Sequence, residues 1–242
     1  MNRQAWSAVL LSIVLLGNAT AHAAAPPPDL TGIWSWDTEK NKGAGRTSLP
    51  WPEKPPWTQE AREKVTAYRA LVEPSGTSPG AFCLGTGMPG STLGSGGYPM
   101  EIIQRPEQIT IIHEAHNELR RIYLGGRKID PNDLFPSRNG YSTGRWEGDT
   151  LVVETMSLKE QVDQTAAHTE DARILERFSV ARDSKGRRIL TLQMTLTDPR
   201  FYTAPVTVTK TWVEAPKGRM LDYECNEPAW EDHLKKLTQK AE

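Results

Sequence analysis

Hydrophobic and polar residues alternate in short segments along most of the chain, and this pattern predicts a series of β-strands. Successive side chains of a strand point to opposite faces, so alternation is typical of strands with one buried face. The clearest example is 206–214, where Val206, Val208 and Trp212 alternate with Thr residues. Strands are predicted at 30–36, 100–104, 108–114, 119–124, 141–146, 150–155, 173–182, 187–197, 206–214 and 221–225.

Compact turn sequences separate several of these segments. Glu147-Gly148-Asp149, residues 183–186 and residues 216–218 each supply a glycine for a tight hairpin turn. Many short strands at hairpin spacing, with little helix, indicate an all-β fold, either an antiparallel barrel or a sandwich.

One helix interrupts this pattern. Thr58 followed by Gln59-Glu60-Ala61 is typical of a helix N-terminus, and the helix is expected to run to about Leu71 and to end before Pro74. Residues 74–97 are rich in Gly, Ser and Pro and form a long loop, which is either a lid or a spacer. We interpret 58–97 as an insertion into one domain that spans 24–242, with a short helix at the charged C-terminal end.

The first residues have the features of a secretory signal peptide at 1–23. Arg3 precedes an apolar run at 8–16, and two overlapping A-x-A cleavage sites follow at 19–23. The apolar run is too short to span a bilayer, and no second apolar run follows. We therefore expect a periplasmic or secreted protein with no transmembrane segment in the mature chain.

Charge and motifs exclude several functions. The chain has 29 basic and 30 acidic residues, so no basic field is available for nucleic acid. No phosphate-binding loop is present, and no cofactor is predicted. The spacing of His113 and His116 would suit metal ligands on a helix, but the two lie in a strand and its turn, so we predict no metal site.

Two cysteines, Cys83 and Cys225, admit one intramolecular pairing in an oxidising compartment. We predict a disulfide between them, with two free buried thiols as the alternative. Two cysteines this far apart do not make a zinc or iron–sulfur site.

Two resemblances bear on the fold. Gly32-Ile33-Trp34 resembles the G-x-W of the first strand in lipocalin-like (calycin) barrels, where the Trp closes the barrel floor. The stretches 98–102, 120–123, 144–153 and 198–203 resemble a large family of mostly uncharacterised exported bacterial proteins. These resemblances imply export and a lipocalin-like antiparallel β-barrel, and they imply no particular activity.

His168-Thr169-Glu170-Asp171 is the candidate catalytic segment. It precedes a long strand and is therefore expected at the rim of the barrel. A neutral imidazole beside carboxylates can serve as a general base near pH 7, with Glu170 or Asp171 orienting His168. Two alternatives are a structural cluster in which His168 binds backbone, and metal binding.

Candidate ligand-binding residues are Arg145, Trp146, Arg121 and Tyr202. An inward Arg145 beside Trp146 would bind a carboxylate or stack on an aromatic ligand; alternatively, Arg145 caps the barrel floor against Trp34. In Arg120-Arg121, alternation sends one side chain inward, where it needs a paired charge from Glu101, Glu154 or Glu176.

The combined hypothesis is an exported barrel protein that binds a small hydrophobic or aromatic molecule in its cavity. An alternative is a cofactor-independent enzyme of the lyase, isomerase or hydratase type that uses His168 in the same cavity. A further alternative is an interaction module of the cell envelope whose barrel is filled by side chains.

Overall fold

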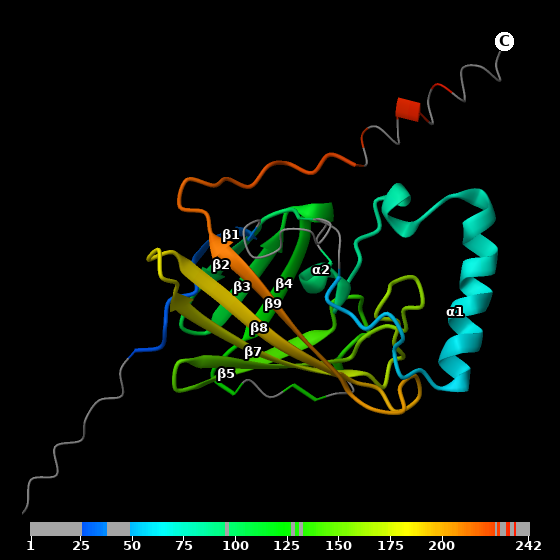
Figure 1. Ribbon diagram of the computed structural model, residues 1–242, viewed down its shortest axis with the longest axis horizontal. Coiled ribbons are helices and arrows are strands. Elements are labelled where there is room, and N and C mark those ends of the chain that lie inside the picture. Colours follow the sequence, from blue (N-terminus) through cyan, green and yellow to red (C-terminus); the bar gives the residue numbers. More distant parts are fainter. Residues whose placement is uncertain are drawn as a thin grey trace, which may run out of the picture.

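Nine strands form a closed barrel in the computed structural model (Figure 1). The structure describes residues 26–37, 49–94, 97–126, 129–130, 133–225, 227, 231–232 and 235. The predicted signal peptide and most of the predicted C-terminal helix lie outside the described residues. The strands are β1 (Gly32–Trp36), β2 (Met100–Gln104), β3 (Gln108–His113), β4 (Glu118–Tyr123), β5 (Tyr141–Glu147), β6 (Thr150–Met156), β7 (Arg173–Arg182), β8 (Arg188–Thr197) and β9 (Val206–Glu214).

The predicted all-β barrel is confirmed, and one predicted strand is wrong. Residues 221–225 contain no strand, because β9 pairs directly with β1 and closes the barrel at Trp34↔Glu214 and Trp36↔Trp212. The chain after β9 instead leaves the barrel wall as an extended tail (Figure 1).

All neighbouring strands are antiparallel except β4 and β5. These two strands are parallel and pair at only two positions, Ile122↔Ser142 and Tyr123↔Thr143. The barrel wall is therefore weakest between β4 and β5.

Large side chains fill the barrel interior. Trp34 is completely buried, its indole Nε1 donates to the backbone oxygen of Leu30 at 2.9 Å, and the guanidinium of Arg188 lies 5.2 Å from its ring centroid. A cation over an indole ring is a favourable contact. Other interior side chains that are at most 2% exposed are Met100, Ile102, Ile109, Ile111, Phe178, Leu192, Met194 and Trp212.

One ion pair crosses this apolar interior. Arg120, which is 2% exposed, donates to both carboxylate oxygens of Glu176, which is 0% exposed. Ser142 and Thr155 accept further hydrogen bonds from the same guanidinium. The prediction that one of the two adjacent arginines turns inward and pairs with a glutamate is confirmed, with Glu176 as the partner.

Helix α1 (Gln59–Val72) stands beside the barrel (Figure 1). The Thr58 side chain caps it by accepting from the backbone N–H of Ala61, as predicted. Its first half is docked: Thr58 N donates to Phe201 O at 2.9 Å, and Lys64 pairs with Glu160 at 2.8 Å. Short helical turns follow as η1 (Glu73–Ser75), η2 (Pro79–Phe82) and α2 (Gly90–Leu93), and later η3 (Ala115–Asn117).

Candidate functional site

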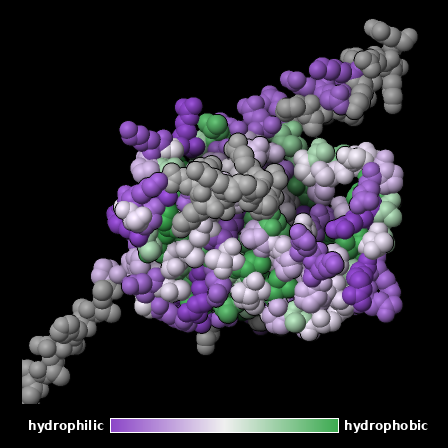
Figure 2. Space-filling view, in the orientation of Figure 1, coloured by the Kyte–Doolittle hydropathy of each residue, from purple (hydrophilic) through white to green (hydrophobic). Residues whose placement is uncertain are grey.

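A groove lies between the second half of α1 and the loops at one end of the barrel. It consists of two adjoining hollows of about 380 and 420 Å³, a size that accommodates a small organic molecule. We call it the α1 groove. It is lined by residues that include Tyr68, Arg69, Val72 and Glu73, Thr77, Ser78, Pro79, Phe82, Leu84 and Thr86, Arg138, and residues 160–165. Figure 2 shows the surface hollowed beside α1.

Apolar side chains are concentrated in one of the two hollows of the α1 groove. Tyr68 and Val72 face Pro79, Phe82 and Leu84 from the opposite segment. Phe82 is 74% exposed and Leu84 is 44% exposed, so two large apolar side chains lie open to solvent beside the groove.

The floor of the groove carries an ion pair with a spare acceptor. Arg138 Nη2 donates a hydrogen bond to Asp163 Oδ2 at 2.7 Å. The second carboxylate oxygen, Oδ1, is buried and accepts no hydrogen bond from any described residue. Burial, followed by the negative charge of Asp163, raises the pKa of Tyr68 above its ordinary value. Tyr68 is therefore a neutral donor or acceptor beside this carboxylate.

A small hairpin holds Asp163 in place. Gln161 and His168 exchange backbone hydrogen bonds of 2.9 Å in each direction, which closes the loop between them. Their side chains also meet, with Gln161 Nε2 3.0 Å from His168 Nε2. Gln161 lines the groove, and its Oε1 is a second buried acceptor without a partner among the described residues.

The buried side chain of His168 packs against this hairpin and contacts the Gln161 amide. It is completely buried, and its Nδ1 lies 3.0 Å from Thr169 O. Burial lowers the pKa of His168, so the ring is neutral. Its Nε2 lies 3.0 Å from the Gln161 amide and 3.0 Å from Met88 O, so both ring nitrogens are in contact with buried polar atoms.

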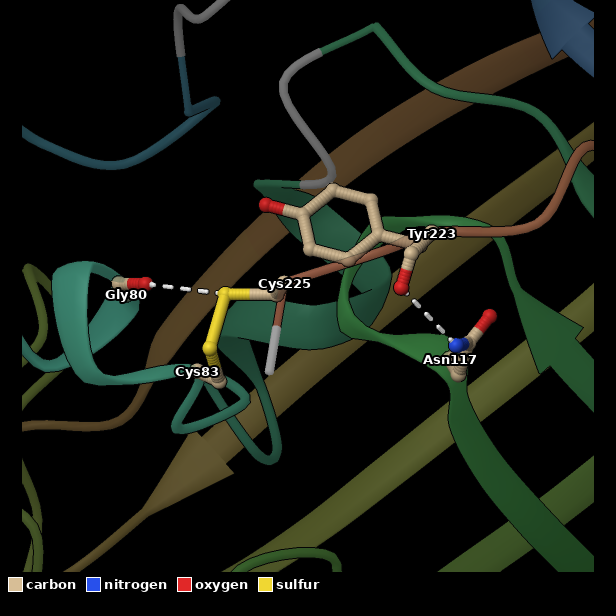
Figure 3. Close-up of a disulfide and its surroundings, with 5 residues drawn as sticks. All are labelled: Gly80, Cys83, Asn117, Tyr223 and Cys225. Carbon is tan, nitrogen blue, oxygen red and sulfur yellow. Dashed lines mark hydrogen bonds between the residues drawn. A yellow bond between two sulfur atoms is a disulfide. The ribbon is translucent and has the colours of Figure 1, made fainter. Parts of the chain in front are cut away.

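The disulfide Cys83–Cys225 ties one groove wall to the C-terminal tail (Figure 3). Cys83 stands between Phe82 and Leu84, so the bond anchors both apolar residues of that wall. The tail is fixed nearby, because Asn117 Nδ2 donates to Tyr223 O at 3.1 Å. The predicted pairing is confirmed, with the two Cα atoms 5.6 Å apart.

The predicted catalytic residues do not come together. Glu170 and Asp171 are exposed, and no hydrogen bond or ion pair joins either carboxylate to His168 within the described residues. The buried carboxylate next to this segment is Asp198, which accepts from Thr169 N at 2.7 Å.

The predicted ligand-binding residues lie in four different environments. Arg145 is on the outer face of β5 and pairs with Glu147 and Glu154, so the expected contact with Trp34 is not formed; Arg188 makes it instead. Trp146 points inward against the core. The remaining two are Arg121, which is exposed on β4, and Tyr202, which is buried and donates to Ala167 O at 2.7 Å.

Two buried titratable residues were not anticipated as inward groups. His113 is the last residue of β3, as predicted, but it is only 1% exposed, and neither of its ring nitrogens has a described partner. Lys210 is 6% exposed; its Nζ donates to Thr92 O and Leu93 O of α2 and lies 5.0 Å from the Trp212 ring centroid. The alternating pattern of β9 places Lys210 on the same face as Trp212, which is the signal that could have revealed it.

Within the described part of the chain, no three His, Cys, Asp or Glu residues are placed to hold a metal ion. No helix among the described residues is long and apolar enough to cross a membrane.

Comparison with known proteins gives no relative: no protein-family model, no curated protein and no solved structure matches the chain.

Proposed function

We propose that the protein binds a small aromatic or hydrophobic molecule in the α1 groove, and that this molecule carries a hydrogen-bond donor such as a hydroxyl group. The observation that carries the proposal is the buried Oδ1 of Asp163, which has no donor among the described residues and belongs to a side chain that lines the α1 groove. A buried acceptor without a donor costs about 1–3 kcal/mol, and a bound hydroxyl group would remove that cost.

The α1 groove is a better candidate for the ligand-binding site than the barrel interior. Interior positions are occupied by fully buried Trp34, Phe178 and Trp212, and Glu176 is already paired with Arg120. The groove, by contrast, combines exposed Phe82 with unpaired buried acceptors, which is typical of a small-molecule site.

Binding also has more support than catalysis by His168. A general base must reach the proton that it abstracts, whereas His168 is completely buried and its nitrogens face Gln161 and backbone oxygens. In the proposed function, His168 is a positioning residue that fixes the Gln161 amide. The Cys83–Cys225 disulfide supports export to an oxidising compartment as part of this proposal.

The experiment is native mass spectrometry of the mature protein purified from a bacterial periplasm, followed by denaturing extraction. We expect a co-purified aromatic molecule with a hydroxyl or amine group, and its loss from an Asp163→Ala variant. Full retention by Asp163→Ala, or a bound molecule with no donor group, would contradict the proposal.

If the purified protein is empty, a thermal-shift panel replaces the extraction. Phenols are expected to stabilise the wild-type protein more than their methyl ethers, because only phenols donate to Asp163. Equal shifts for both series, or none for either, would count against the groove as a donor-selective site.

A further inference from the structure

A separate cleft lies where β4 and β5 diverge. The first half of β4 has no paired strand on its β5 side, because pairing is limited to Ile122↔Ser142 and Tyr123↔Thr143. A cleft of about 310 Å³ opens between β4 and residues 137–141.

Uncompensated positive charge in the cleft comes from Arg121, because Arg120 is paired with Glu176 and Arg138 with Asp163. Three arginines line the cleft, Arg120, Arg121 and Arg138, and none of its described lining residues is Asp or Glu. The chain as a whole is nearly balanced, with 29 basic and 30 acidic residues. A concave surface lined by one sign of charge attracts ions of the opposite sign.

Two of these arginines have guanidinium donors to spare. Arg121 is exposed and makes no hydrogen bond or ion pair with any described residue. Arg138 donates hydrogen bonds from Nε to Gly85 O and from Nη2 to Thr86 O and Asp163 Oδ2. Its Nη1 has no partner among the described residues. Arg120 differs, because Glu176 occupies its guanidinium.

An aromatic wall stands beside these donors. Tyr123 and Tyr141 both line the cleft, and their rings stack with centroids 5.3 Å apart and planes inclined by 25°. Flat rings pack favourably against such a surface. The neighbouring Asn139 adds a polar group.

We propose that the β4–β5 cleft is a binding site for a small aromatic carboxylate. The carboxylate of the ligand would accept hydrogen bonds from Arg121 and from Nη1 of Arg138. The aromatic ring of the ligand would pack against Tyr123 and Tyr141. Guanidinium groups bind carboxylates with paired, charge-assisted hydrogen bonds. This site is distinct from the α1 groove, although Arg138 lines both.

The test is ¹⁹F NMR titration with 4-fluorobenzoate, and with 4-fluorobenzamide as the neutral analogue. We expect saturable binding of the carboxylate and at least about tenfold weaker binding of the amide. Arg121→Gln should weaken carboxylate binding at least about tenfold, whereas the exposed turn variant Arg105→Gln should match the wild type. Unfolding midpoints of both variants establish that they are folded.

Three outcomes would overturn the proposal: no carboxylate binding at millimolar concentration, equal binding of the amide, or unchanged affinity in Arg121→Gln. Asp163→Ala separates the two sites. Loss of carboxylate binding in Asp163→Ala but not in Arg121→Gln would place the ligand in the α1 groove and would also overturn the cleft site.

Discussion

Arg138 and Asp163 form an ion pair through one carboxylate oxygen, at 2.7 Å, and leave the other oxygen of Asp163 buried without a donor. This arrangement has a direct chemical consequence. The side chain of Asp163 lines the α1 groove, one wall of which is apolar. A ligand that fits must therefore offer a donor at one end and an apolar body at the other.

The disulfide should matter for both stability and binding. Replacing both Cys83 and Cys225 with Ser should lower the free energy of unfolding by about 2–5 kcal/mol, because the bond closes a loop of 142 residues. The groove wall carrying Phe82 and Leu84 would also lose its anchor, so affinity for a groove ligand should fall several-fold. Urea denaturation and ligand titration measure the two effects; unchanged affinity in the folded variant would show that the wall needs no anchor.

His113 should make the protein less stable in acid. Burial, followed by the charges of Arg120 and Lys210, lowers the pKa of His113 from 6.5 to about 3. Between these values the unfolded chain binds a proton that the folded protein does not bind, so stability should fall by about 1.4 kcal/mol per pH unit as the pH drops from 6.5 to 3.

The control for this prediction is His113→Leu, which removes the titrating group and two unpaired buried nitrogens. Its unfolding free energy should depend less steeply on pH across the same range, and at pH 7 it should be at least as stable as the wild type. An identical slope in both proteins, measured by urea denaturation, would show that His113 does not cause the loss.

Lys210 should make the stability of the protein depend on pH between about pH 7 and 10.5. Burial lowers its pKa from 10.5 to about 7, so between these values the unfolded chain binds more protons than the folded protein. Stability should therefore gain about 1.4 kcal/mol per pH unit from this residue as the pH rises from 7 to 10.5. Lys210→Met should remove that gain; a Lys210→Met protein with the wild-type slope would rule out Lys210 as its source.

Removing only one partner of the buried Arg120–Glu176 ion pair should destabilise the protein strongly. Glu176→Gln leaves Arg120 buried beside Ser142 and Thr155 with no counter-charge, and should destabilise the barrel by about 3–5 kcal/mol. The double variant Arg120→Met with Glu176→Leu should recover much of this loss, because no buried charge remains. Chemical denaturation of the single and double variants tests this, and equal losses in both would contradict it.

Strand positions were predictable because each strand has one buried face. The pattern in β7 and β9 located both strands to the residue, and the Thr58 cap located the start of α1. The strand at 221–225 failed because a hydrophobic segment alone does not show whether the barrel needs another strand. In this fold β1 already occupies that edge of β9.

The groove could not be predicted in the same way. Asp163 and Gln161 lie in a loop without periodicity, and their partners, Arg138 and His168, are fixed only by tertiary structure. For the same reason, proximity in sequence gave Glu170 and Asp171 as the partners of His168, whereas the fold turns both toward solvent. Arg145 was expected to face inward because it lies mid-strand, but its position in β5 places it outside.

The decisive measurement is calorimetric titration of the wild-type protein and Asp163→Ala with 2-naphthol and its methyl ether, 2-methoxynaphthalene. Asp149→Ala, in the exposed β5–β6 turn, is the matched control. We predict that the wild type and Asp149→Ala bind 2-naphthol about tenfold more tightly than the ether, and that Asp163→Ala loses this preference. Equal affinity of the wild type for both compounds, or an undiminished preference in Asp163→Ala, would contradict a groove whose specificity comes from the free oxygen of Asp163.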